Sequence, residues 1–131
     1  MNELKKILIL DDDDSIRRIA ELTLTRIGKF EVKLCKHHTE FFELLTGYLP
    51  DLILLDVMMP GMDGPTVLSN LRKDPRTASI PVVFMTAKIQ RHEVEAYSQL
   101  GASGLIRKPF EPAELPVELR RLYAGAMKVC A

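Results

Sequence analysis

Residues 6–18 read KILILDDDDSIRR, and in this stretch a run of aliphatic side chains leads directly into a run of acidic ones. The aliphatic residues Ile7–Leu10 predict a strand that is buried on both faces. The carboxylates of Asp11–Asp14 follow without a break. Acidic runs usually lie on solvated surfaces or in tails, so a block of negative charge at the end of a core strand needs a specific explanation.

The composition of the chain narrows the classes of protein to consider. The 131 residues are enough for one domain with a full hydrophobic core, and 18 acidic side chains balance 18 basic ones. A net charge of zero favours neither direct binding of nucleic acid nor attachment to a membrane surface. Cys35 and Cys130 form no metal-binding or CxxC pair, which favours a reduced, cytoplasmic compartment. The apolar run before Asp11 is too short for a signal peptide or a membrane span.

Strand-like and helix-like segments alternate along the chain. Five apolar runs predict strands: Lys6–Leu10, Phe30–Cys35, Asp51–Leu55, Pro81–Met85 and Ser103–Arg107. Helical periodicity predicts helices over about 16–27, 39–47, 65–73, 90–100 and from Pro112 onward. Asp13 or Asp14 can cap the first helix, and Gly28 is expected to end it in a left-handed conformation. The alternation predicts one α/β domain with a parallel sheet covered on both faces.

Polar residues follow four of the five predicted strands. Asp11 and Asp12 end the first strand, Asp56 the third, Thr86 the fourth and Lys108 the fifth. In open parallel sheets the functional crevice lies beyond the carboxyl ends of the strands. If the strand order is 2-1-3-4-5, the first and third strands are neighbours and the three acids lie within a few ångströms of one another.

Three clustered carboxylates predict a bound cation. Two like charges ~4 Å apart repel by roughly 4 kcal/mol at an effective dielectric constant of 20, so the acids must take up protons or bind a cation. Oxygen ligands favour Mg²⁺, with Mn²⁺ as an alternative. With the cation bound, phosphoryl oxygens can bind to it and to Lys108, Thr86 can donate a hydrogen bond, and one carboxylate can act as the nucleophile. The pattern therefore predicts phosphoryl transfer to a carboxylate.

Four motifs carry a resemblance to a known family. They are ILILDDDD (7–14), PDLILLDVMMPGMDG (50–64), IPVVFMTA (80–87) and LGASGLIRKPF (100–110). In this order and spacing, the chain resembles a receiver domain of the two-component response regulators, the CheY-like superfamily, over about Leu4–Leu122. The resemblance implies a doubly wound, flavodoxin-like (βα)5 three-layer sandwich. We expect a single receiver domain over residues 1–131, with the last helix and tail beyond the core and no output domain.

The resemblance also implies a role for each strand-end residue. Asp56 would accept a phosphoryl group from the phosphohistidine of a histidine kinase or histidine phosphotransfer protein. Mg²⁺ would be held by Asp11, Asp12, Asp56 and the backbone carbonyl of Met58. Thr86 would be the switch hydroxyl. Lys108 would pair with the phosphoryl group, and the Lys108–Pro109 peptide bond would be cis. The modified domain, a monomer or weak dimer, would bind a downstream protein that the sequence does not name.

The chain departs from the family pattern at one position and has two notable residues at others. Leu105 stands where the family usually has an aromatic residue whose rotamer follows the switch hydroxyl, so this chain lacks that ring at this position. Met58 and Lys88 lie two residues after Asp56 and Thr86, where side chains of the family flank the phosphoryl group. Arg17 and Arg18 are interpreted as a solvated helix face that could contact a phosphodonor.

Three other functions can be weighed against the sequence. A flavin or nucleotide carrier needs a glycine- or hydroxyl-rich phosphate loop after the first strand, where this chain has aspartates. A dehalogenase-like phosphatase needs a second acid two residues after the nucleophile, where this chain has Met58. The remaining alternative is a protein-interaction module that works without phosphorylation.

Overall fold

The computed structural model describes residues 3–87 and 91–130, with side chains as far as residue 127. The strands are β1 (Lys6–Leu10), β2 (Glu31–Cys35), β3 (Leu52–Asp56), β4 (Val82–Thr86) and β5 (Gly104–Arg107). The helices are α1 (Asp14–Leu22), α2 (His38–Leu44), α3 (Gly64–Lys73), α4 (Arg91–Gln99) and α5 (Leu115–Cys130). A π-helical segment, η1 (Thr23–Ile27), continues α1.

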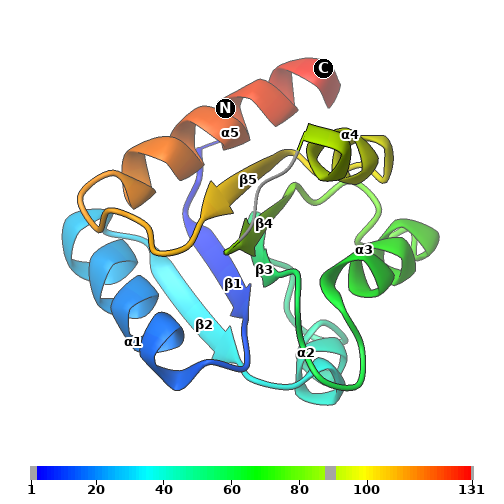
Figure 1. Ribbon diagram of the computed structural model, residues 1–131, viewed down its shortest axis with the longest axis horizontal. Coiled ribbons are helices and arrows are strands. Elements are labelled where there is room, and N and C mark those ends of the chain that lie inside the picture. The colour runs from blue at the N-terminus through cyan, green and yellow to red at the C-terminus, as the bar shows by residue number, and fades with distance from the viewer. Residues whose placement is uncertain (1–2, 88–90, 131) are drawn as a thin grey trace.

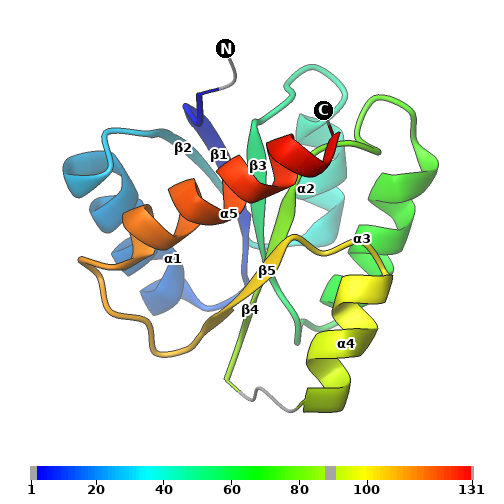
Figure 2. The same ribbon diagram turned by 90° about the horizontal axis from the view of Figure 1, so that it is seen from above.

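All strand pairs are parallel, and the order across the sheet is β2-β1-β3-β4-β5. Helices α1 and α5 cover one face of the sheet, and α2, α3 and α4 cover the other (Figure 1). Figure 2 shows the two helical layers from above, with the sheet between them. The predicted strand order and the flavodoxin-like three-layer fold are therefore confirmed.

The core lies on both faces of the central strands. Every residue of β3 and of β4 is buried, whereas the edge strand β2 alternates between exposed and partly buried residues until its last residue, Cys35, which is buried. Alternate residues of one strand point to opposite faces. Thus Leu52 and Leu54 pack in the cluster with α1 and α5, and Ile53 and Leu55 in the cluster with α2 and α3. This two-sided burial explains why the central strands are apolar without alternation.

The junction between η1 and β2 corrects one prediction. Gly28 has a φ of −78°, so the expectation of a left-handed glycine was wrong, and Lys29 takes the positive φ of 61° instead. A Cβ at position 28 would lie 2.6 Å from Cε2 of Phe30 and 2.8 Å from the backbone oxygen of Leu24. Close packing, rather than a turn conformation, therefore explains the glycine.

Helix boundaries differ by a few residues from the predicted ones. Asp13 caps α1, because its Oδ1 accepts hydrogen bonds from the amides of Ser15 (2.8 Å) and Ile16 (3.1 Å). Helix α5 begins at Leu115 rather than near Pro112, and the predicted start of the fourth helix, Gln90, lies outside the described residues. In the part of the chain that the structure describes, no helix combines the length and apolar character needed to cross a bilayer.

Candidate functional site

The three acidic residues predicted to cluster do lie together at the carboxyl end of the sheet. Asp11 follows β1 and Asp56 ends β3, and these strands are hydrogen-bonded neighbours. Asp11 is fully buried, Asp56 is 5% exposed, and Asp12 is exposed. One carboxylate oxygen from each residue lies within 4.8 Å of the other two. The strand order thus brings together acids that are far apart in the sequence.

Lys108 connects two of these acids. It follows β5, and its Nζ lies 2.8 Å from Oδ2 of Asp11 and 3.0 Å from Oδ1 of Asp56. The contact with Asp56 has hydrogen-bond geometry. Oδ2 of Asp11 is buried and accepts no well-aligned hydrogen bond from the described residues, so its contact with Lys108 is an ion pair alone. Among the described residues, one ammonium therefore pairs with two of the three clustered carboxylates.

This imbalance changes the pKa values of the buried groups. Burial raises the pKa of Asp56 to about 6, and the neighbouring Asp11 and Asp12 add to this effect, although the contact with Lys108 opposes it. Burial lowers the pKa of Lys108, but its contacts with Asp11 and Asp56 outweigh burial and leave that pKa raised. Lys108 therefore stays charged, while the ionised form of Asp56 is less favoured than that of a free aspartate, as its raised pKa shows.

The donor set fits a hard divalent cation. The cluster supplies oxygen ligands from three carboxylates, one of them exposed, and one buried oxygen of Asp11 lacks a well-aligned donor. Mg²⁺ binds carboxylate oxygens and retains several waters, so a partly open acidic site suits it better than a closed nitrogen or sulfur site would. These residues are typical of the Mg²⁺ site of receiver domains.

The loop between β1 and α1 contains an interaction that the sequence reading missed. Nη1 of Arg17 donates a 2.7 Å hydrogen bond to the backbone oxygen of Asp11, and Nη2 pairs with Asp14. Only 13% of the Arg17 side chain is exposed, so its interpretation as part of a solvated face was wrong, whereas Arg18 is exposed. The spacing of three residues between Asp14 and Arg17 on one helix was the available signal.

Thr86 and Lys108 lie next to each other at the ends of β4 and β5. Thr86 is 6% exposed, and its backbone oxygen accepts a 2.9 Å hydrogen bond from the amide of Lys108. The Lys108–Pro109 bond is cis, as the resemblance implied. Met58 is 77% exposed, while Lys88 lies outside the described residues. The five strand-end side chains that the sequence singled out are therefore gathered at one edge of the sheet.

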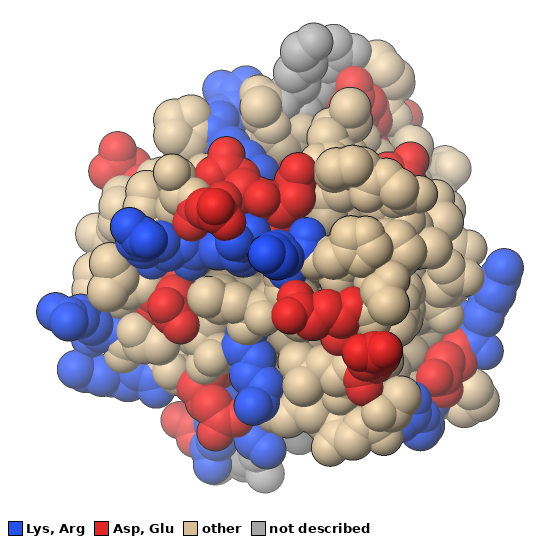
Figure 3. All heavy atoms as spheres, turned by 90° about the horizontal axis from the view of Figure 1, so that it is seen from below, with Lys and Arg blue, Asp and Glu red and all other residues tan. Residues whose placement is uncertain are grey.

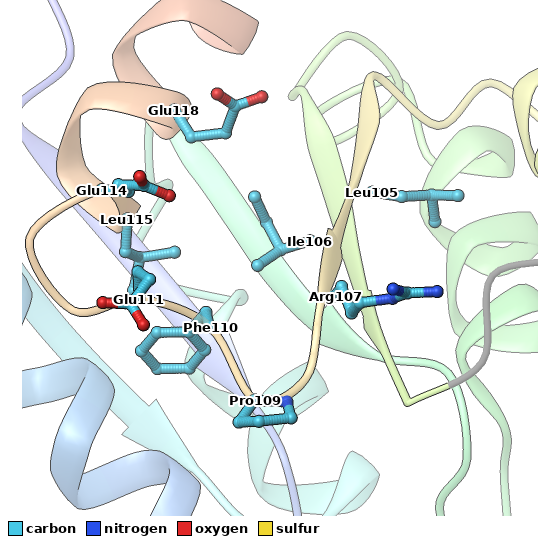
Figure 4. A pocket seen from close by; sticks show the side chains of 9 residues that line it. All are labelled: Leu105, Ile106, Arg107, Pro109, Phe110, Glu111, Glu114, Leu115 and Glu118. Carbon is cyan, nitrogen blue, oxygen red and sulfur yellow. The ribbon is translucent and has the colours of Figure 1, made fainter.

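Leu105 lies on the side of β5 that faces α4. In Figure 4, Leu105 and Ile106 point to opposite sides of the strand, with Ile106 on the side of α5. Leu105 packs against the cluster that contains Phe84 and Tyr97, whose ring centroids are 5.0 Å apart. Tyr97, which lies on α4 itself, thus places an aromatic ring next to Phe84. This contact could not be predicted from the sequence of β5.

A cavity of about 360 Å³ lies between β5 and α5, with Ile106, Phe110 and Leu115 among its lining and Glu111, Glu114 and Glu118 around it (Figure 4).

On the face of the molecule seen from below, acidic and basic side chains lie next to one another (Figure 3). That face presents no broad field of a single sign, in keeping with the zero net charge.

Comparisons with known proteins agree with this geometry. The model of the response regulator receiver domain matches residues 7–120. The response regulator Rre1 of Synechocystis is 38% identical over 125 residues, which are 95% of this chain and 54% of Rre1. A putative response regulator of Chloroflexus aurantiacus has a similar structure, with a TM-score of 0.84, 33% identity and coverage of 93% of this chain and 99% of its own.

A chemotaxis response regulator of Vibrio cholerae, CheY4, is 28% identical to this chain. Its TM-score is 0.84, and the match covers 92% of this chain and 99% of CheY4. The chain spans about half the length of several curated relatives that it matches, so these relatives are larger regulators.

Proposed function

Because the chain belongs to the response regulator receiver domain family, we propose that it is a phosphoacceptor of a two-component or phosphorelay system and that Asp56 receives the phosphoryl group. The receiver domain is a signalling module rather than an enzyme. The observation that carries the proposal is the contact of Lys108 with both Asp11 and Asp56, beside an acidic cluster with cation-binding geometry.

Asp56 supplies the nucleophile in this proposal. An oxygen of its carboxylate forms a bond to phosphorus while the phosphorus–nitrogen bond of the donor phosphohistidine breaks on the opposite side. The imidazole leaves with the electron pair of that bond. Asp56 suits this role because it ends a fully buried strand and its carboxylate lies at the edge of the sheet.

Mg²⁺ would be held by the carboxylates of Asp11, Asp12 and Asp56 and by the backbone carbonyl of Met58, with Mn²⁺ as an alternative ion. When bound, the cation would neutralise negative charge on the carboxylates and on the phosphoryl oxygens. The proximity of the three acids supports this assignment, and the carbonyl of Met58 is carried over from the family resemblance.

Lys108 and Thr86 would respond to the new phosphoryl group. The ammonium of Lys108, which now contacts two carboxylates, would bind a phosphoryl oxygen, and the hydroxyl of Thr86 would donate a hydrogen bond to another. Because the amide of Lys108 is bonded to the backbone of Thr86, the ends of β4 and β5 would move together. The charge change would shift a pre-existing equilibrium toward a form that binds a downstream protein.

The partners follow from this chemistry. Membership of the family implies a histidine kinase as phosphodonor, and a histidine phosphotransfer protein could serve in a phosphorelay. We propose that the domain works in the cytoplasm, because Cys35 and Cys130 form no CxxC or metal-binding pair, as is usual in a reduced compartment. We propose neither direct nucleic-acid binding nor membrane attachment, and we propose a monomer or weak dimer.

The test is the intact mass of the protein after incubation with a small acyl phosphate. The wild-type chain, Asp56→Asn and Asp51→Asn would be compared, each with Mg²⁺ and with a chelator. We expect one added phosphoryl group on the wild-type and Asp51→Asn proteins, only with Mg²⁺, and none on Asp56→Asn. Asp51 is the matched control because it is an aspartate that precedes the same strand at its other end.

Two outcomes would contradict the proposal. Modification of Asp56→Asn to the wild-type level would place the phosphoryl group elsewhere. Failure to modify the wild-type protein, together with partner binding that is unchanged by Mg²⁺ and phosphodonor, would instead support an interaction module that does not depend on phosphorylation.

A further inference from the structure

We infer that Arg17 is a positioning residue for the divalent-cation site, because it holds the backbone of Asp11 in the orientation that directs the acidic loop toward Asp56. The inference rests on the proposed function, since it concerns the cation that this function requires. It begins from the contact between Nη1 of Arg17 and the backbone oxygen of Asp11, at 2.7 Å.

The polar atoms of Asp11 are held from several directions. Its amide donates a 3.1 Å hydrogen bond to the backbone oxygen of Cys35 on β2, and its Oδ1 accepts a 2.9 Å bond from the amide of Asp13. Its backbone oxygen is bound by Arg17. These contacts leave Oδ2, which faces Lys108, as the oxygen with no well-aligned hydrogen bond from the described residues. A fixed backbone thus presents a carboxylate that can still take a ligand.

Arg17 suits this task because of the shape of its side chain. A guanidinium is a planar fork that can donate to two acceptors at once, and Arg17 binds the oxygen of Asp11 and the carboxylate of Asp14. These acceptors lie at the two ends of the acidic run, before and within the first turn of α1. Four adjacent carboxylates repel one another. Because the positively charged guanidinium of Arg17 binds both ends of the acidic run, it opposes the spreading of the loop.

Charge and positioning predict opposite effects on Mg²⁺ affinity. The positive charge of Arg17 repels a divalent cation, so its removal would tighten Mg²⁺ binding if charge were its main influence. Its removal would weaken binding if its main influence were the orientation of Asp11 and Asp12. Changes to residues that orient metal ligands typically reduce metal affinity about 10- to 100-fold, which exceeds the expected charge effect near a solvated surface.

The experiment is a titration of Mg²⁺ into the unphosphorylated, ¹⁵N-labelled protein at constant ionic strength, followed by amide chemical shifts. The variants are Arg17→Ala and the matched control Arg18→Ala, which removes the same charge from the next, exposed position. We expect about tenfold weaker binding for Arg17→Ala. For Arg18→Ala we expect an affinity within about twofold of the wild-type value, or slightly tighter binding.

A conservative variant and a rate measurement separate positioning from general stability. Arg17→Lys keeps the charge but loses the fork, so we expect an affinity at least about threefold weaker than wild type and closer to it than that of Arg17→Ala. With a small acyl phosphate, the Mg²⁺ concentration at half-maximal rate should rise about tenfold in Arg17→Ala, while the rate at saturating Mg²⁺ changes less than about twofold.

Wild-type affinity or tighter binding in Arg17→Ala would overturn the inference and leave the proposed function intact. If Arg17→Ala does not fold by circular dichroism, Arg17→Lys decides the question, and an affinity equal to wild type would overturn the inference. Absence of Mg²⁺ binding to the wild-type protein would overturn the inference and the proposed function together.

Discussion

An aspartate lies at each end of β3, and the two carboxylates have different kinds of neighbours. Asp51 directly precedes the strand, and its Oδ2 accepts hydrogen bonds from the backbone amides of Lys5 (3.0 Å) and Lys6 (2.8 Å). Asp56 ends the strand, where it meets the carboxylates of Asp11 and Asp12 and the ammonium of Lys108. Backbone amides therefore supply hydrogen bonds to the carboxylate of Asp51, whereas the carboxylate of Asp56 depends on a positive charge.

The direction of the strands explains this difference. In a parallel sheet, all strands begin at one edge and end at the other. The first residues of a strand can offer backbone N–H groups to a carboxylate, as Lys5 and Lys6 do, whereas the last residues offer carbonyl oxygens, which cannot donate. An aspartate at the amino end therefore stabilises the fold, and one at the carboxyl end requires a positive charge. The following predictions test this contrast, beginning with the largest effect.

Replacement of Lys108 by Met should have the largest effect. It removes the ammonium that contacts both Asp11 and Asp56, and removal of one partner from a buried ion pair typically costs about 3–5 kcal/mol. The free energy of unfolding from urea denaturation, at pH 7 and without Mg²⁺, measures the loss. Lys36→Met, at an exposed position, serves as the control, and equal stability of the two variants would contradict the prediction.

Replacement of Asp56 by Asn should stabilise the metal-free protein. The folded-state pKa is raised from 3.8 to about 6, so the folded state retains a proton that the unfolded state has lost. The contribution of Asp56 to the free energy of unfolding therefore falls as the pH rises from about 4 to about 6, by up to about 3 kcal/mol. The amide of Asn does not ionise, so the free energy of unfolding of Asp56→Asn does not fall in this way.

The measurement for Asp56→Asn is urea denaturation from pH 4 to pH 8 in a chelator. The stability of the variant relative to wild type should grow across the window from about 4 to about 6 and then stay constant. A difference that is flat across this window, or that has the opposite slope, would show that Asp56 is not a destabilised carboxylate.

Mg²⁺ should stabilise the wild-type protein through the carboxyl edge alone. A cation at 100 times its dissociation constant adds about 2.7 kcal/mol to the free energy of unfolding if it binds only the folded state. Thermal or urea denaturation with Mg²⁺ and with a chelator measures this increment. We expect it to be retained in Asp51→Ala and reduced in Asp12→Ala. An increment that is unchanged in Asp12→Ala would place the cation elsewhere.

Replacement of Asp51 by Ala should have the smallest effect and the opposite sign to Asp56→Asn. It removes the acceptor of two backbone amides in a position where water can partly replace it, so we expect a loss of about 1–2 kcal/mol. Asp51→Asn should recover part of this loss, because an amide oxygen can still accept. A stabilising effect of Asp51→Ala, measured by urea denaturation, would remove the contrast between the ends of β3.

Most of the fold could be predicted because its signals are local. The apolar run Lys6–Leu10 coincides with β1, and the helix start after Asp13 follows from a carboxylate that can reach the first free amides of the same turn. The failures were short-range contacts whose three-dimensional geometry the pattern of residue types does not specify. Gly28 is required by the ring of Phe30, and Arg17 folds back onto the oxygen of Asp11.

The sequence by itself determined which residues stand at the ends of the strands, because hydrophobic runs set the strand boundaries and the residues after them can be read directly. It also predicted the acidic cluster, because carboxylates follow the first and third of those runs. Only the tertiary structure decided that one ammonium, 52 positions from Asp56, contacts two carboxylates at once, and that Asp56 is buried deeply enough to raise its pKa to about 6. Distances and burial of this kind depend on the packing of neighbouring strands and helices, which no single segment contains.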